Sequence, residues 1–194
     1  LGLDDTTPVV FAAGRLEHQK AHTDLVRAME LVLLRHEPAV LLIAGRDGNA
    51  SERLRAQIAA MSNGSVHVRL LGYRADVLDL LAAADVMALP SLFEGTAGIA
   101  LEAMAVGTPI VSTRLDGMEG ILQDGVNSLL VDCGDAPAMA AAIDRLLTDT
   151  GLGAQLADHA RRDFVARFTL ERSAERMAEL YLDVTSGRGR AARS

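Results

Sequence analysis

Residues 91–113 read SLFEGTAGIALEAMAVGTPIVST, and this stretch decides the fold. An apolar run over residues 86–89 precedes it and predicts a buried strand, and the small and apolar residues of 97–105 predict a helix. Gly107 and Pro109 end that helix, since glycine favours the position just past a helix and proline cannot continue one. A second apolar strand follows at once. The stretch is therefore a strand–loop–helix–strand unit, which is typical of parallel sheets.

Two carboxylates stand at the mouth of this unit, Glu94 in the loop and Glu102 in the helix. Side chains on a helix lean toward its N-terminus, so Glu102, roughly 8 Å along the axis, leans toward the loop. The free N–H groups at the helix start form a phosphate site between the two acids. This arrangement predicts a nucleotide-sugar site. The plainer alternative is an acid at a helix start and a second acid on a solvated helix face.

The composition bounds the class of protein. With 194 residues, of which 49% are hydrophobic, the chain is one domain or a large part of one and can bury a substantial core. No apolar run approaches the roughly 20 residues that span a bilayer. The net charge of −7 argues against a nucleic-acid partner, which needs a basic face.

Cys133 is the only cysteine, which excludes an internal disulfide and fits the reducing environment of the cytoplasm. We interpret it as a small buried apolar residue rather than a nucleophile. The histidines show no metal-ligand spacing, so we expect surface or capping roles for them and no metal site. They are His18, His22, His36, His67 and His159.

Strands and helices alternate along the chain. We predict strands at 9–13, 40–44, 66–71, 86–89, from 110 and at 128–131, and helices at 23–35, 51–61, 75–83, 97–105, 116–122 and 136–147. Ser51 and Asp135 are the expected N-caps of two of these helices. Six continuous apolar strands separated by helices predict an α/β fold, a doubly wound parallel six-stranded sheet. Ligands of such folds bind beyond the carboxyl ends of the strands.

The C-terminal part changes to helices without strands. We expect helices around 156–168 and 170–182, with Thr169 capping the second, so the nucleotide-sugar-binding domain covers 1–184 and includes C-terminal helices over 151–184. Residues 185–194 are rich in Gly, Arg, Ala and Ser and predict a flexible, solvated tail rather than a phosphate-binding arm. The chain begins with Leu1 rather than Met. This suggests a piece of a longer polypeptide, although processing or trimming gives the same start.

The loop after the first strand carries the cations. Residues 12–20 read AAGRLEHQK, in which Gly14 allows a close turn and Arg15 and Lys20 flank the mouth of the sheet. Both side chains suit phosphate oxygens, Arg as a planar fork and Lys as a point charge. Lys20 is the only lysine in the chain. Two interpretations stay open, a phosphate-binding lysine and a surface or helix-capping residue.

Three motifs in order give the chain a family resemblance. They are Gly-Arg-Leu-x3-Lys from Gly14, Glu-x7-Glu with Ala-Met-Ala-x-Gly-x-Pro-Ile-Val from Glu94, and Asp-Gly-Val-Asn-Ser-Leu-Leu-Val-x2-Gly-Asp from Asp124. The chain resembles, from about 9 to 184, the C-terminal donor-binding half of a group 1 (family 4) retaining glycosyltransferase. That resemblance implies a Rossmann-like domain of the GT-B fold whose N-terminal, acceptor-binding domain is absent from this chain.

The resemblance also implies roles for residues. Arg15 and Lys20 would bind the diphosphate and stabilise the leaving nucleotide, and Glu94 would contact the donor sugar. These three are the implied catalytic residues, while Glu102 would accept hydrogen bonds from the ribose. The implied donor-site residues are Gly14, Arg15, Lys20, Gly45, Arg46, Gly72, Tyr73, Arg74, Glu94, Gly95, Thr96, Ala97, Gly98 and Glu102, with the loops of 45–46 and 72–74 beside the base and 96–98 presenting N–H groups.

Two segments depart from the family pattern. Thr96 and Ala97 stand where the family often has Phe-Gly, so that the glycine is one place later, at Gly98. Downstream, residues 116–120 carry Glu119 one place earlier than the family's Gly-Gly-x-x-Glu does. These shifts affect which N–H groups face the donor and whether Glu119 contacts it.

The expected activity is hexosyl transfer from a nucleoside-diphosphate sugar, UDP- or GDP-linked, to an acceptor hydroxyl with retention. The resemblance implies a bacterial, cytoplasmic enzyme that needs no metal or other cofactor. Its expected partners are the sugar nucleotide and its own missing N-terminal domain. Peripheral membrane association through that missing half is compatible with this expectation. We expect no nucleic-acid partner and no transmembrane segment. The isolated chain should bind nucleotide and be nearly inactive.

Other functions are weighed against this one. A nucleotide-binding module without transferase activity remains the alternative. A dinucleotide oxidoreductase is disfavoured because Ala13-Gly14-Arg15-Leu16 replaces Gly-x-Gly-x-x-Gly after the first strand. A phosphorylase is disfavoured because Lys20, the only lysine, lies on the wrong loop for pyridoxal phosphate.

Overall fold

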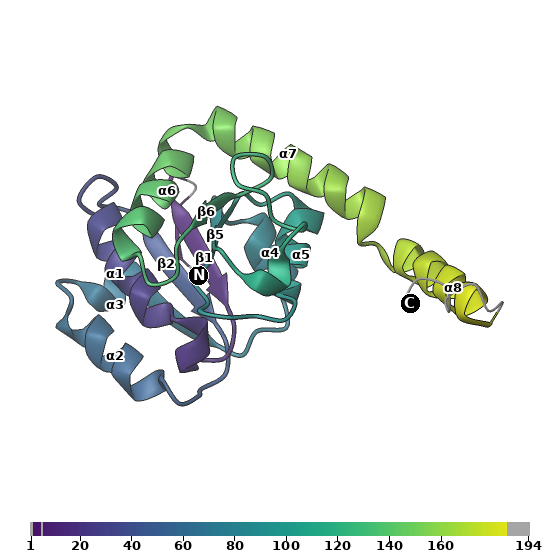
Figure 1. The fold of residues 1–194 in the computed structure, drawn as a ribbon. Helices are drawn as coiled ribbons and strands as arrows, with labels where there is room; N and C mark the ends of the chain where they lie inside the picture. Colours follow the sequence, from purple (N-terminus) through teal and green to yellow (C-terminus); the bar gives the residue numbers. More distant parts are fainter. Residues whose placement is uncertain (1, 5, 186–194) are drawn as a thin grey trace.

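A parallel sheet organises the computed structural model, which describes residues 2–4 and 6–185 (Figure 1). Its strands are β1 (Val9–Ala13), β2 (Val40–Ala44), β3 (Val68–Gly72), β4 (Val86–Leu89), β5 (Ile110–Thr113) and β6 (Leu129–Val131). The order across the sheet is β3-β2-β1-β4-β5-β6, and every neighbouring pair is parallel. The strand order reverses direction between β1 and β4, so the predicted α/β sheet is confirmed.

Helices cover both faces of the sheet, as Figure 1 shows. In chain order they are η1 (His18–Lys20), α1 (His22–Val32), α2 (Ser51–Ala60), α3 (Gly64–His67), α4 (Val77–Ala82), α5 (Gly98–Val106), η2 (Asp116–Met118), α6 (Ala136–Thr148), α7 (Thr150–Arg167) and α8 (Leu170–Thr185). One face packs against α1, α2 and α6, and the other against α4 and α5. α7 leaves the first layer and crosses to pack on α5. The sheet is therefore doubly wound.

Alternate residues of each strand supply the two cores. Val10 and Ala12 of β1 belong to the core beneath α1 and α6, whereas Phe11 belongs to the core beneath α4 and α5. All three side chains are fully buried. Full burial of a Phe side chain stabilises a fold by about 1.5–3 kcal/mol, and the adjacent strands repeat this pattern. Continuous apolar strands are thus explained by burial on both faces.

Two predicted elements are replaced in part by a different kind of structure. The strand predicted at 66–71 begins only at Val68, because Asn63 adopts a left-handed conformation (φ 54°) and starts the short helix α3. Val66 consequently faces solvent. The helix predicted at 116–122 is only the 3-10 turn η2, and Gly120 at φ 72° leads the chain away.

The predicted helix caps have mixed outcomes. Asp135 caps α6 as predicted, accepting a hydrogen bond from the N–H of Ala138 (2.9 Å). The N-cap predicted at Ser51 is wrong. Ser51 is the first residue of α2, and its hydroxyl accepts from the N–H of Gly48 (2.8 Å), which closes the preceding loop.

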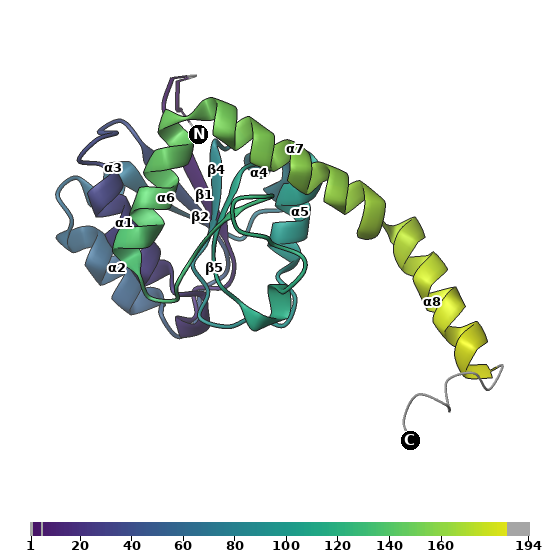
Figure 2. The ribbon, with the colours of Figure 1, turned by 45° about the horizontal axis from the view of Figure 1, so that its top comes forward.

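The C-terminal helices are longer than predicted. α7 begins at Thr150 instead of 156, because Asp149 accepts from the N–H of Leu152 (2.9 Å) and caps the helix ahead of its glycines. Thr169 does cap α8, since its hydroxyl accepts from the N–H of Arg172 (3.3 Å). α8 extends away from the sheet, as Figure 2 shows, and no residue of α8 is buried.

The flexible tail predicted at 185–194 lies outside the described residues from 186 onward. Over residues 2–4 and 6–185, no helix has the length and apolar character that crossing a membrane requires.

Candidate functional site

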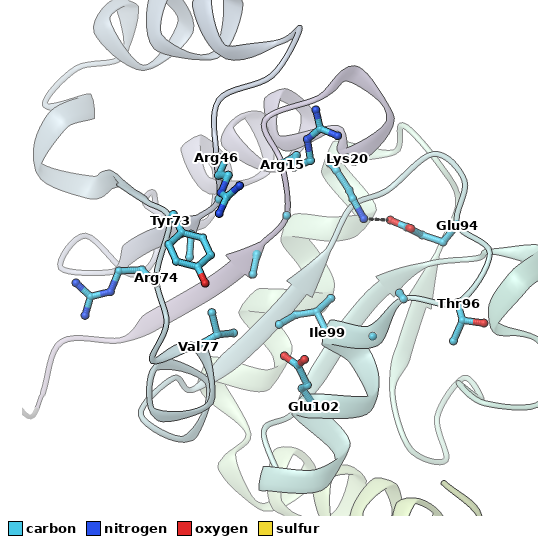
Figure 3. Close-up of a pocket in the computed structure, with 16 residues that line it drawn as sticks. Arg15, Lys20, Arg46, Tyr73, Arg74, Val77, Glu94, Thr96, Ile99 and Glu102 are labelled. Atoms are coloured by element: carbon cyan, nitrogen blue, oxygen red, sulfur yellow. Dashed lines mark hydrogen bonds and ion pairs between the residues drawn. The ribbon is translucent and has the colours of Figure 1, made fainter. Parts of the chain in front are cut away.

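A cavity of about 490 Å³ opens at the carboxyl ends of β1, β2 and β4, where the strand order reverses (Figure 3). This is the position at which open α/β sheets bind ligands, because loops diverge there on both sides. The lining residues are Ala13, Gly14, Arg15, Lys20, Ala44, Gly45, Arg46, Tyr73, Arg74, Val77, Glu94, Thr96, Ala97, Gly98, Ile99 and Glu102.

The structure brings together the residues that sequence reasoning assigned to a donor site, except Gly72 and Gly95, which do not line the cavity. Gly72 instead accepts a hydrogen bond at its carbonyl from the N–H of Gly45 (2.8 Å), which ties the ends of β2 and β3. Sequence reasoning missed four apolar lining residues. They are Ala13, Ala44, Val77 and Ile99. Ala13 and Ala44 end predicted strands, so the rule that ligands bind at strand ends could have found them.

Two glycines let the loops after β1 and β2 approach each other. A Cβ on Gly45 would overlap the carbonyl oxygen of Gly14, so only glycine fits there. Gly14 adopts φ 153°, and a Cβ on it would lie 3.2 Å from Cδ of Lys20. The aliphatic stem of Lys20 therefore lies directly over Gly14. This packing directs the ammonium group across the cavity floor.

The ammonium of Lys20 meets Glu94. Its Nζ lies 2.5 Å from Oε1 of Glu94, and the two side chains are 20% and 8% exposed, respectively. The hydroxyl of Ser91 donates to the same oxygen at 2.7 Å. An ion pair shielded from water in this way is costly to break, because the remaining charge stays buried without a partner.

Several hydrogen bonds fix the loop that carries Glu94. Gln19 donates from its side chain to the carbonyl of Phe93 (2.9 Å) and accepts at its own carbonyl from the N–H of Leu92 (2.8 Å). Gly117 lies against the loop from the other side, since a Cβ there would overlap the carbonyl oxygens of Glu94 and Gly95. The downstream segment with the shifted family motif thus supports this loop.

The N-terminus of α5 opens into the cavity. Ala97 precedes the helix, no side chain caps it, and its first turn carries no acidic residue. The N–H of Ala97 is already used, because it donates to Sδ of Met118 (3.3 Å), and Gly98 and Ile99 line the cavity beside it at the helix start. Unsatisfied N–H groups and the positive end of the helix dipole favour an anion at this place.

Glu102 and Thr96 flank this helix start. Figure 3 shows the carboxylate of Glu102 directed into the cavity, one turn along α5, whereas the hydroxyl of Thr96 points away from Lys20. Glu102 is exposed to solvent. It is placed to accept hydrogen bonds from a bound molecule.

The opposite wall consists of exposed side chains. Arg46 stacks over the ring of Tyr73, with its guanidinium carbon 4.7 Å from the ring centroid. Tyr73 is 66% exposed, and Figure 3 shows its hydroxyl toward the cavity. Arg74 points away and pairs with Asp76, and that hydrogen bond lowers the pKa of Asp76. Arg15, with a side chain 67% exposed, pairs with Glu17 at 2.9 Å.

His22 corrects the expectation that the histidines are surface or capping residues. It is 4% exposed, and its ring lies beside the backbone of Gly14, where among the described residues it finds no hydrogen bond of good geometry. Burial lowers its pKa to about 4, the backbone of Gly14 acts in the opposite direction, and the charge of Lys20 adds a smaller lowering. The spacing of His22 to Leu25, Val26 and Met29 places it on the buried stripe of α1, a signal that the sequence offered.

Cys133 is a second correction, since it is exposed rather than buried. It follows β6 in a loop, where its sulfur lies 3.5 Å from the carbonyl oxygen of Arg114. Residues just past a strand end leave the core, so the general preference of free cysteine for buried positions did not hold here. Among the described residues, no group of three or more His, Cys, Asp or Glu side chains could hold a metal ion.

Comparisons with known proteins identify relatives of this fold and site. The family model described as "Glycosyl transferases group 1" matches residues 7–149. The lipopolysaccharide core biosynthesis glycosyltransferase LpsE of Rhizobium meliloti is 33% identical over 181 residues, which are 93% of this chain and 50% of that protein. A D-inositol 3-phosphate glycosyltransferase of Corynebacterium urealyticum is 34% identical over 188 residues, 93% of this chain and 44% of that protein.

Solved structures give the same picture. The crystal structure of Anabaena HepE in complex with UDP-glucose matches with a TM-score of 0.84 and 27% identity, over 91% of this chain and 49% of that one. The C-terminal domain of a group 1 glycosyl transferase from Francisella tularensis, at 19% identity, shares the fold with a TM-score of 0.75, over 84% of this chain and 87% of that one. The chain spans about half the length of the curated relatives it matches.

Proposed function

The chain belongs to the group 1 glycosyl transferases, and we propose that it is the donor-binding half of a retaining enzyme of that family. The enzyme would transfer a hexosyl group from a nucleoside-diphosphate sugar to an acceptor hydroxyl. One observation carries the proposal. A single cavity joins Lys20, the open N-terminus of α5 and two carboxylates, Glu94 and Glu102, at the reversal of the strand order.

The diphosphate fits the middle of the cavity. Lys20 and the N-terminus of α5 face this space, and Arg15 reaches it from the rim. A unit charge pair at 4 Å contributes about 4 kcal/mol at an effective dielectric of 20, so these groups offset much of the charge of a departing nucleotide. Stabilising that leaving group is the chemistry that the site offers, as the bond from the sugar carbon to the diphosphate oxygen breaks.

The two carboxylates define the ends of the ligand. Glu94 would accept hydrogen bonds from donor-sugar hydroxyls, and Glu102 from the ribose hydroxyls. The base would then lie against the wall of Arg46 and Tyr73, whose exposed, stacked side chains can accept a flat ring. The N–H groups of Gly98 and Ile99 would complete the contacts to the diphosphate.

The rest of the enzyme is part of the proposal. Because the relatives are about twice as long, a further domain would supply the acceptor site, and this chain alone would bind nucleotide with little or no transfer. We expect UDP or GDP as the nucleotide, because HepE is described as a complex with UDP-glucose and the base wall sets no evident preference. We further propose that the enzyme is bacterial and cytoplasmic and needs no metal.

Calorimetric titration of this chain with UDP, GDP, UDP-glucose and inorganic diphosphate tests the donor role. We expect saturable 1:1 binding of at least one nucleoside diphosphate, tighter than that of inorganic diphosphate. Absence of binding for every nucleotide would contradict the proposal. An activity assay of the full-length protein separates the alternative. Tight nucleotide binding without any sugar transfer would identify a nucleotide-binding module instead.

A further inference from the structure

Ser91 lies behind the cavity wall and holds Glu94. It lies two residues past the end of β4, is fully buried and is not one of the cavity-lining residues. Its hydroxyl donates to Oε1 of Glu94 at 2.7 Å. A buried hydroxyl needs a hydrogen-bond partner, and Glu94 is the partner of Ser91.

Both donors to Glu94 meet the same oxygen. Lys20 and Ser91 donate to Oε1, and among the described residues no hydrogen bond is made to Oε2. A carboxylate rotates freely about its last bond unless its oxygens are held in different surroundings. Two donors on one oxygen fix that rotation and leave the second oxygen with its acceptor capacity unused.

Ser91 is itself anchored to the next strand. The hydroxyl of Thr113, at the end of β5, donates to the carbonyl oxygen of Ser91 at 2.5 Å, and Thr113 is buried. A continuous chain of hydrogen bonds therefore runs from β5 through Ser91 to Glu94. Positions that are defined by two neighbouring strands are held more precisely than positions on a free loop.

We propose that Ser91 is a positioning residue that presents one oxygen of Glu94 to the donor sugar, an inference that rests on the proposed function of Glu94. When a diphosphate draws the ammonium of Lys20 toward itself, the hydroxyl of Ser91 remains on Oε1 and keeps the carboxylate in place. Sugar recognition then survives the loss of the ion pair.

The test compares Ser91→Ala with wild type in calorimetric titrations of UDP and UDP-glucose. We expect the affinity for UDP-glucose to fall about 10-fold while that for UDP changes less than about 2-fold, because one hydrogen bond to a charged group is lost. Ser91→Cys retains a weak donor, so its affinity for UDP-glucose should lie between those of wild type and Ser91→Ala. Ser112→Ala is the matched control, because Ser112 is equally buried but its hydroxyl donates to the carbonyl of Thr113 (2.8 Å).

Glu94→Ala tests the proposed role of Glu94 separately from that of Ser91. If it removes the affinity difference between UDP-glucose and UDP while Ser91→Ala preserves that difference, the role of Ser91 is overturned and that of Glu94 stands. If Glu94→Ala leaves the difference unchanged, Glu94 does not contact the sugar and both proposals for it fail. Equal losses for UDP and UDP-glucose in Ser91→Ala would show only a structural role and would also overturn the inference.

Discussion

The two walls of the cavity are built differently. On one wall, Lys20 and Glu94 are paired, largely shielded from water and tied by hydrogen bonds to neighbouring strands and loops. On the other, Arg46 and Tyr73 stack on each other at the surface, while Arg15 is exposed on the rim beside Lys20. Side chains in water hold their positions weakly, whereas a buried, hydrogen-bonded pair holds its position well.

This difference suggests that the packed wall serves the transfer reaction and the exposed wall the selection of the nucleotide base. The packed wall faces the proposed diphosphate and sugar, where small displacements reduce the rate steeply. The exposed wall faces the proposed base, where a few contacts at a time can change. Removing the cation of the packed wall should therefore cost much and act on every phosphate ligand, whereas variants of the exposed wall should cost little and act selectively.

Lys20→Met should have the largest effect, because it keeps the stem over Gly14 and removes only the charge. We expect affinity for UDP and inorganic diphosphate to fall about 100-fold, and stability to fall by about 3 kcal/mol because Glu94 stays buried without its cation. Calorimetry and urea unfolding measure these effects. Arg15→Met, on the exposed rim, is the comparison and should lose only about 3-fold. Equal losses in the two variants would contradict the contrast between the walls.

Acid should lower the stability of the folded protein through His22, the first residue of α1. The pKa of His22 is about 4 in the folded protein against 6.5 for the ordinary side chain, owing to burial and the charge of Lys20. Between these values the unfolded chain binds more protons, so stability decreases by about 3 kcal/mol as the pH falls from 6.5 to 4. Urea unfolding across this range measures the slope.

His22→Leu removes the titrating group and should flatten that slope. Asp76 and Asp124, whose pKa values are lowered, lose their contributions only below about pH 3.8, outside this window. An unchanged slope in the variant would exclude His22 as its source.

Glu102→Ala should have an intermediate and selective effect. The carboxylate is proposed to accept from the ribose, so we expect about a 10-fold loss of UDP affinity and no change for inorganic diphosphate. Parallel titrations with both ligands give the ratio. Equal losses would remove the ribose role and would point to a general effect on the cavity.

Tyr73→Ala should have the smallest effect, and its value is in its selectivity. We expect about a 3-fold loss for UDP, an altered ratio of UDP to GDP affinity and no change in stability, because the ring is mostly exposed. Competition between the two nucleotides measures the ratio. A loss as large as that of Lys20→Met would show that the exposed wall is as rigid as the packed one.

The sequence indicated cavity-lining residues on both walls, and the reason is physical. Lys20 and Glu94 lie in the segments that follow β1 and β4, and Glu102 lies one turn into the helix that follows, and an apolar parallel sheet brings all such segments to one edge. The spatial partners were not predictable in this way. That Lys20 pairs with Glu94 depends on how loops 74 residues apart in sequence pack, and the hydrogen bond from Ser91, three residues before Glu94, depends on the shape of one loop.

Local chemistry explains where the fold prediction failed. Gly151 lies inside α7 because Asp149 caps the helix ahead of it, and the helix start predicted near 156 missed that cap. His22 is buried because three-dimensional packing of α1 outweighs the polarity of its ring. In both cases a tertiary or capping contact prevailed over the propensity of a single residue.

The structure of this chain with bound UDP-glucose tests the central claim most directly. We predict the diphosphate within hydrogen-bond distance, about 3 Å, of Nζ of Lys20 and of the N–H groups at the start of α5, with the ribose at Glu102 and the glucose at Glu94. A ligand bound in the reverse direction, with its ribose at Glu94, or bound outside this cavity would contradict the account.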